Sequence, residues 1–217
     1  MVKVGAHAAM RMTALSLALT AGSADAASLR DLPTDVLCDL IEDAEAAEPG
    51  HPQRVRVLSL LTEDQRVVVR SQVAEAMGSL WPDAELEAAA ELRKLARDES
   101  ESVRLSAAVG LARAVERATA PERIDLVCTW ALSEHADERL ALARALTWTT
   151  PVFVADLVLE QLARDENAPV RAAALAAVAR HFHEDSSAYT RIVTQCEGDP
   201  DQNVQRLAQA LMKRARA

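Results

Sequence analysis

Histidine and carboxylate side chains cluster at one point of the sequence, His181-Phe182-His183-Glu184-Asp185. Imidazole and carboxylate groups are the ligands that a protein offers to zinc and similar metal ions. Residues two apart on a helix point to different sides, so His181 and His183 do not easily share one ion unless the helix has already ended. A favourable position of histidine near a helix C-terminus is the simpler explanation. We therefore expect no metal site here.

The motifs of the common enzyme chemistries are absent from the sequence. It has no His-Glu-x-x-His zinc motif, no Gly-x-Ser-x-Gly nucleophile elbow and no paired-carboxylate motif. With 6 glycines in the whole chain, a phosphate-binding glycine loop is hard to accommodate. Cys38, Cys128 and Cys196 are far apart and form no CxxC pair, so we expect small buried thiols in a reducing compartment. The sequence predicts a protein that is not an enzyme, with no catalytic residue, no cofactor and no metal.

The composition predicts an all-α protein with an acidic surface. Apolar residues make up 50% of the chain and aromatic residues 3%, so the core must consist of Ala, Leu and Val. Such small side chains let helices approach one another closely. The formal net charge of -9 argues against a nucleic-acid partner, because that binding depends on Lys and Arg neutralising phosphates. No stretch approaches the ~18 apolar residues of a membrane span, so none is expected.

One pattern recurs along the chain with a period of about 34 residues. An Asp lies six positions before an Arg, a Val directly precedes that Arg, and an apolar residue follows seven positions later. The copies are Asp64 to Arg70, Asp98 to Arg104 and Asp165 to Arg171, with a looser copy from Asp199 to Gln205 and a worn one around Arg139. Periodicity of this size is typical of repeat architectures.

Each copy is expected to be a helical hairpin whose second helix begins at the Val. Counted from that Val as position zero, positions 4, 5, 7 and 8 lie on one helical face and form a buried stripe. In the fourth hairpin Glu138 takes the place of the Val. The predicted helices cover residues 32–47, 53–61, 66–80, 84–97, 103–118, 122–133, 138–148, 152–164, 170–182, 187–196 and 203–214.

The Asp–Val–Arg–Ala–Ala–Leu register, clearest in residues 165–175, resembles HEAT repeats, in particular the short bacterial HEAT-like type also found in phycobilin lyase subunits. The resemblance covers roughly residues 53–214. Tetratricopeptide and ankyrin repeats have similar lengths, but their Trp/Gly/Tyr set and Thr-Pro-Leu-His motif are absent. The resemblance implies an all-α, right-handed α-solenoid of about six HEAT-like helical hairpins.

Residues 1–50 are expected to form N-terminal capping helices or a degenerate first repeat, and residues 51–217 the HEAT-like repeat array. Two interpretations of the first 27 residues stay open. Lys3 and Arg11, an apolar stretch over 12–21 and a small-residue site at 24–26 resemble a secretory signal peptide. Because that stretch is short and interrupted by polar residues, an amphipathic capping helix is the alternative. The protein is expected to be cytoplasmic, or exported if the signal is real.

The recurring Asp and Arg residues are predicted to form a structural ladder. Each Arg lies at the edge of the buried stripe, near the turn that holds the Asp. We expect these side chains to pair within or between neighbouring repeats, stabilising geometry with little net energy. The expected members are Asp64, Arg70, Asp98, Arg104, Asp165 and Arg171.

The second helices carry the better clue to function. Positions 2, 6 and 10 point away from the buried stripe, and Leu, Val, Trp and Arg occur there, as in protein interfaces. The alternative is that Trp148 turns into the core between repeats. The candidate partner-binding residues are Leu105, Val109, Arg113, Leu140, Arg144, Trp148 and Arg180.

A secondary docking face is formed by acidic residues near the N-terminus. Asp35, Asp39 and Asp43 are four residues apart, so they line one side of a helix. A solvated helix face is the simpler explanation, and docking of a basic partner is the alternative.

These observations predict a non-catalytic scaffold or adaptor that binds a protein partner in the concave groove of a HEAT-like solenoid. Two other classes are alternatives. A phycobilin-lyase-like subunit would bind a tetrapyrrole chromophore and would need aromatic and polar groups along the groove. Less favoured is an enzyme like the HEAT-like alkylpurine DNA glycosylases, which would need a basic, aromatic-lined groove.

Overall fold

The structure, a computed structural model, describes residues 29–46, 52–149, 155–181 and 186–216, and the elements within these ranges are helices. This confirms the all-α class. Residues 1–27, for which a signal peptide and a capping helix are the two interpretations, lie outside the described residues. The elements are α3 (Thr34–Ala46), α4 (Pro52–Leu61), α5 (Val67–Met77), the 3-10 helix η1 (Gly78–Leu80), α6 (Glu85–Ala96), α7 (Glu101–Arg117), α8 (Ala120–Ala131), α9 (Ala136–Leu146), α10 (Ala155–Leu162), α11 (Ala168–His181), α12 (Ser187–Gln195) and α13 (Gln202–Ala215).

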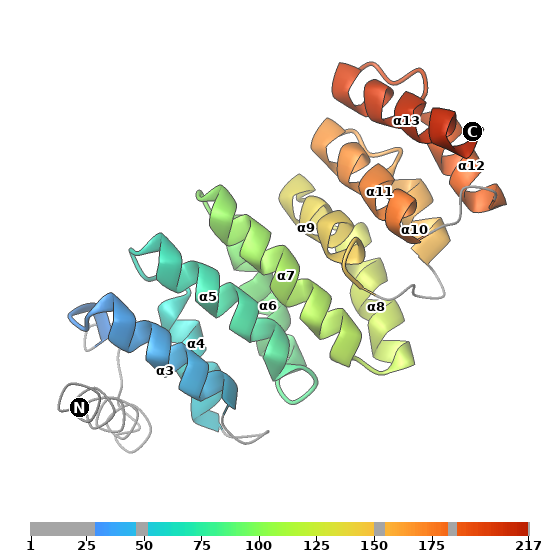
Figure 1. Cartoon of the computed structure of the whole chain (residues 1–217). Coiled ribbons are helices and arrows are strands. Elements are labelled where there is room, and N and C mark those ends of the chain that lie inside the picture. Colours follow the sequence, from blue (N-terminus) through green and yellow to red (C-terminus); the bar gives the residue numbers. More distant parts are fainter. Residues whose placement is uncertain (1–28, 47–51, 150–154, 182–185, 217) are drawn as a thin grey trace, which may run out of the picture. The chain divides into compact units, whose positions relative to one another are not determined.

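The chain divides into two compact units, Met1–Arg117 and Ala118–Ala217. In unit 1, α4 pairs with α5 and α6 with α7, and α3 packs against α4 and α5. In unit 2 the hairpins are α8 with α9, α10 with α11, and α12 with α13. Within each unit the hairpins stack in chain order, as in a helical-repeat solenoid, with the second helices side by side on one face (Figure 1).

The core is the stripe that the repeat register predicts. The position-zero residues Val69, Val103, Val170 and Val204 are at most 1% exposed. Where the fourth hairpin has Glu138 instead, that side chain is also buried, and its Oε2 accepts a hydrogen bond from Ser133 Oγ at 2.8 Å. Burial of a carboxylate is costly unless it is hydrogen-bonded, so this contact explains how the worn repeat keeps its packing.

Helix α5 and the 3-10 helix η1 that follows it approach α7 backbone to backbone at two glycines, Gly110 of α7 and Gly78 of η1. A Cβ added to Gly110 would lie 2.1 Å from the carbonyl oxygen of Ala74, and one added to Gly78 would lie 2.0 Å from the carbonyl oxygen of Gly110. No side chain fits into such gaps. The two glycines therefore set how closely the second and third repeats pack.

Candidate partner-binding surface

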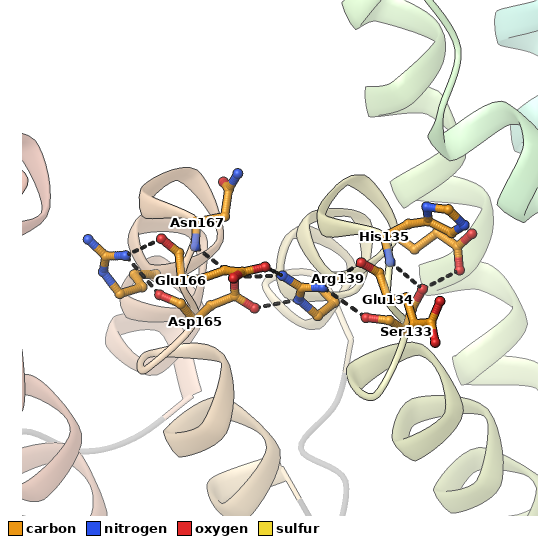
Figure 2. Close-up of polar contacts among 9 residues, drawn as sticks. Ser133, Glu134, His135, Arg139, Asp165, Glu166 and Asn167 are labelled. Carbon is orange, nitrogen blue, oxygen red and sulfur yellow. Dashed lines mark hydrogen bonds and ion pairs between the residues drawn. The ribbon is translucent and has the colours of Figure 1, made fainter.

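Arg139, at the start of α9, joins the turn of its own hairpin to the turn of the next. Its Nε lies 2.5 Å from Asp165 Oδ2 and its Nη2 3.0 Å from Asp165 Oδ1, while its Nη1 donates to the carbonyl oxygens of Ser133 (2.8 Å) and Glu134 (3.2 Å). Figure 2 shows Arg139 between these two turns. The Arg139 and Asp165 side chains are 11% and 6% exposed, so this pair is largely shielded from water.

The same bidentate pair recurs in both units. In unit 1, Arg70 donates to the Asp98 carboxylate at 2.7 and 2.9 Å, and in unit 2 Arg171 donates to Asp199 at 2.7 Å from both nitrogens. The hydrogen bonds from Arg171 lower the pKa of Asp199, although burial acts in the opposite direction. In each case the carboxylate belongs to the turn one hairpin further along the chain.

Arg104 and Asp64 make different contacts. Arg104 Nη1 donates to the backbone carbonyl of Asp98 at 2.8 Å, and not to its carboxylate. The Asp64 carboxylate is bound by Arg66 at 2.7 and 2.6 Å, and Arg70 Nη1 reaches the Asp64 carbonyl at 2.7 Å. The hydrogen bonds from Arg66 lower the pKa of Asp64. Sequence reasoning missed Arg66, although it lies two residues after a ladder Asp.

Unit 2 exposes a large aromatic ring and an arginine near the ends of two adjoining second helices. Trp148 is 54% exposed, so it does not turn into the core, and it follows α9, which ends at Leu146 rather than at the predicted residue 148. Arg180 is exposed in the last turn of α11. His181 Nε2 is hydrogen-bonded to the Leu146 carbonyl, which brings the ends of α11 and α9 together. Leu140 and Arg144 are half-buried on the same face of α9.

On the second-helix face of unit 1, Arg113 is held by acidic neighbours. Its Nη1 lies 3.3 Å from Glu45 Oε1 and its Nη2 3.3 Å from Glu75 Oε2, so it bridges α3, α5 and α7. Leu105 is 39% exposed and Val109 is half-buried. Glu75 occupies position 6 of α5, and an acidic residue at that outward position was a signal for this ion pair.

The predicted acidic docking face lies on α3. Asp35 is exposed and Asp39 and Asp43 are half-buried. Asp35 and Asp39 both take part in interactions within the molecule. Burial, followed by the negative charges of Asp39, Glu42 and Asp35, raises the pKa of the Cys38 thiol.

Unit 2 also has an open cleft of about 750 Å³ between the α8–α9 turn and α10, which sequence reasoning missed. Leu132 and Leu157, which line it, are 71% and 64% exposed. Apart from Ala131 the remaining lining is polar, and its Glu160 is bound by Arg164 at 2.6 Å and Arg191 at 2.7 Å. The two leucines fall outside the repeating register, so nothing in that pattern indicated them.

Among the described residues, no group of three or more His, Cys, Asp or Glu side chains could hold a metal ion. Of the histidine and carboxylate cluster at residues 181–185, His181 belongs to the described part of the chain, whereas residues 182–185 lie outside it. In the same ranges no helix is long and apolar enough to cross a membrane. Cys196 is a buried free thiol whose Sγ is 3.5 Å from the Ala163 carbonyl, and burial raises its pKa to about 11.

Stacked helical hairpins with one exposed face of second helices define an all-α helical-repeat protein. No protein-family model and no curated protein sequence matches the chain. Among solved structures it is similar to the designed armadillo repeat protein YIII(Dq)4CqI, with 16% identity over 87% of this chain and 97% of that chain and a TM-score of 0.38. A second designed armadillo repeat protein, solved in complex with the peptide (KR)4, has 14% identity over 87% and 96% and a TM-score of 0.40.

An archaeal HEAT-like repeats protein from Thermococcus onnurineus NA1 has 12% identity over 85% of this chain and 80% of that chain, with a TM-score of 0.40. Similarity at these levels concerns the helical-repeat architecture and adds no argument about function. Function has to be argued from the exposed faces themselves.

Proposed function

We propose that this chain is a non-catalytic interaction scaffold that binds a protein partner through its second helices. The observation that carries the proposal is Trp148, which is 54% exposed just after the end of α9, while Arg180 is exposed in the last turn of the adjoining helix α11. Trp and Arg are the residues most enriched at interface hot spots, because each offers a large contact area or several hydrogen bonds. Leu140 and Arg144 extend the same face.

Unit 1 contributes a weaker surface in this proposal. Leu105 is partly exposed and Val109 is half-buried. Arg113 already has two carboxylate neighbours, so a partner would have to displace Glu45 or Glu75 to use it. We therefore expect the binding energy to come mainly from unit 2.

The two alternative classes have less support. A tetrapyrrole-binding subunit needs several aromatic groups along its binding face. The outward positions within α9, α11 and α13 carry no aromatic residue, and Trp148 lies just after the end of α9. A DNA-binding enzyme needs a continuous basic face, whereas the outward positions of α3 and α5 include Glu42 and Glu75.

The test is affinity capture from a lysate of the native host, followed by identification of the bound protein by mass spectrometry. Wild type is compared with Leu140→Asp plus Trp148→Ala. The matched control is Leu157→Ser, which changes an apolar residue that is 64% exposed on a first helix of the same unit. Circular dichroism must show that all three proteins are equally helical.

The proposal expects the same identified protein with wild type and with Leu157→Ser, and its loss with the double variant. Equal capture by the double variant would overturn the choice of face. Loss with Leu157→Ser alone would assign binding to the cleft. Enrichment of nucleic acid or a bound pigment, with no protein, would support one of the alternatives.

A further inference from the structure

Helices α11 and α13 of unit 2 carry several basic side chains. They contain no Asp or Glu, although the whole protein carries a net charge of -9. Of their basic residues, Arg171 is bound to Asp199, and Arg206 Nη2 donates to Gln202 Oε1 at 3.2 Å. Arg180, Arg206, Lys213 and Arg214 are exposed, and Arg214 also takes part in an interaction within the molecule. Helix α3 shows the opposite pattern, with five acidic residues and no basic one. The part of the second-helix face of unit 2 that α11 and α13 form is therefore basic, on a protein of acidic net charge.

Three exposed residues occupy equivalent sequence positions at the C-terminal ends of these second helices. Trp148, Arg180 and Arg214 each lie ten residues after the position-zero residue of their hairpin; Arg180 and Arg214 are in the last turns of α11 and α13, and Trp148 lies two residues after α9 ends at Leu146. These helices pack side by side in chain order (Figure 1). The hydrogen bond between His181 and the Leu146 carbonyl brings the ends of α9 and α11 together. We call these residues the Trp148–Arg180–Arg214 row.

We propose that this row binds an acidic peptide segment of the partner protein, an inference that rests on the function proposed above. Neighbouring helices pack about 8–10 Å apart, and an extended peptide rises about 3.3 Å per residue. One step along the row therefore corresponds to about three peptide residues. The fitting ligand has an apolar residue against Trp148, a carboxylate three positions later at Arg180, and a second carboxylate three positions after that at Arg214.

The ligand chemistry follows from what the row presents. Guanidinium groups bind carboxylates through paired, charge-assisted hydrogen bonds. Ala172, Ala176 and Ala210, at the other outward positions of α11 and α13, leave room for a peptide backbone to approach. Arginines in the last turn of a helix also interact favourably with the helix dipole, and that effect accounts for Arg180 and Arg214 taken alone. It explains neither the exposed Trp148 nor Arg206, which lies in the first half of α13.

The experiment is selection of a displayed random peptide library on the full chain. Wild type is compared with Arg180→Glu plus Arg214→Glu, and with the matched charge reversal Arg56→Glu plus Arg164→Glu at exposed positions away from the row. Selected peptides are then titrated by fluorescence anisotropy at low and high salt. A single-stranded oligonucleotide is titrated in parallel, and size-exclusion chromatography records self-association.

We expect wild type to enrich peptides with an apolar residue followed by two acidic residues at a spacing of about three. The row variant should weaken their binding roughly tenfold or more and select basic peptides instead, whereas the matched control should change it by about twofold or less. Added salt should weaken binding, because exposed charges are screened.

Several results would overturn the inference. Acidic peptides that bind the row variant as tightly as wild type would place their site elsewhere. Preferential binding of the oligonucleotide, or self-association abolished by the row variant, would assign the row to a different ligand. Selection of purely apolar peptides that depend on Trp148 would sink the acidic ligand and leave the scaffold function standing. If no peptide is selected and Leu140→Asp plus Trp148→Ala captures the partner as well as wild type does, both the acidic-peptide site and the proposed binding through the second helices are refuted.

Discussion

Asp165→Asn is the substitution that tests most sharply how one hairpin is joined to the next. The Asp165 carboxylate accepts hydrogen bonds from Arg139 Nε at 2.5 Å, from Arg139 Nη2 at 3.0 Å and from the Asn167 backbone N–H at 2.9 Å. Asparagine has nearly the same shape but no charge and one acceptor oxygen. The variant therefore leaves the largely buried guanidinium of Arg139 without its buried anionic partner, and the exposed Glu166 carboxylate, 3.3 Å from Nη2, is the anion that remains.

The magnitude follows from the burial of this pair. Removing one partner of a buried ion pair costs about 3–5 kcal/mol. Arg139 keeps its bonds to the Ser133 and Glu134 carbonyls, so we expect the free energy of unfolding to fall by about 2–3 kcal/mol. Glu166→Gln is the matched control, because Glu166 touches the same guanidinium at 3.3 Å but is 86% exposed. Its loss should cost about 0.5 kcal/mol or less.

Urea denaturation followed by circular dichroism gives the two free energies. Because repeat proteins open locally, amide exchange of α9 and α11 should show the same order. Replacing both partners, Arg139→Met with Asp165→Leu, should recover much of the lost stability, since neither charge is then left unpaired. If Asp165→Asn and Glu166→Gln lose equal stability, the ladder pairs do not join the hairpins energetically, and the reasoning is refuted.

Three further predictions concern packing, pH and thiol reactivity. Gly110→Ala should destabilise unit 1 by about 2 kcal/mol or more in urea denaturation, because the added Cβ would lie 2.1 Å from the Ala74 carbonyl oxygen. Helix propensity alone predicts the opposite, so a stabilised variant would contradict this close contact. The hydrogen bonds from Arg171 lower the pKa of Asp199 below its ordinary value of 3.8. The stability that the ionised Asp199 carboxylate gives the folded protein is therefore complete above pH 3.8 and is lost as the pH falls through the lowered pKa. The difference in unfolding free energy between wild type and Asp199→Asn should therefore shrink below about pH 4 and stay constant above it. A difference that grows on acidification would contradict the lowered pKa of Asp199. Cys196, with a pKa of about 11 and a buried Sγ, should react with maleimide at neutral pH only after denaturation, and rapid labelling of the native protein would show that this part of unit 2 opens readily.

The helices could be predicted from the sequence because burial alone sets their pattern. Val69, Val103, Val170 and Val204 mark the start of each buried stripe, and the structure buries all four. A helix that buries one face must repeat apolar residues at helical spacing, and a hairpin repeat must then repeat that spacing along the chain. The repeat register could therefore be recognised from the sequence without knowing which helices pack against one another.

The partners of the charged residues could not be predicted in the same way. An Arg at the edge of the stripe lies near the turn of its own hairpin and near that of the next, and the sequence does not distinguish them. Arg70 in fact binds the carboxylate of Asp98, 28 residues later. The pair of Arg113 and Glu45 joins residues 68 apart. Such contacts depend on how helices stack, which a local pattern does not contain.

The division of the chain into two compact units, Met1–Arg117 and Ala118–Ala217, was also beyond the sequence pattern. The repeat register continues across that point, so no break in the pattern indicated it. The expected N-terminal cap over residues 1–50 and repeat array over residues 51–217 stay predictions.

Site-specific photocrosslinking tests the central claim, that the second-helix face of unit 2 binds the partner, most directly. Trp148 and, separately, Leu157 are replaced by p-benzoylphenylalanine in the full chain, and the protein is irradiated with the identified partner. The account predicts a crosslinked complex from position 148 and none from position 157. A complex from position 157 alone would contradict it and assign binding to the cleft beside α10.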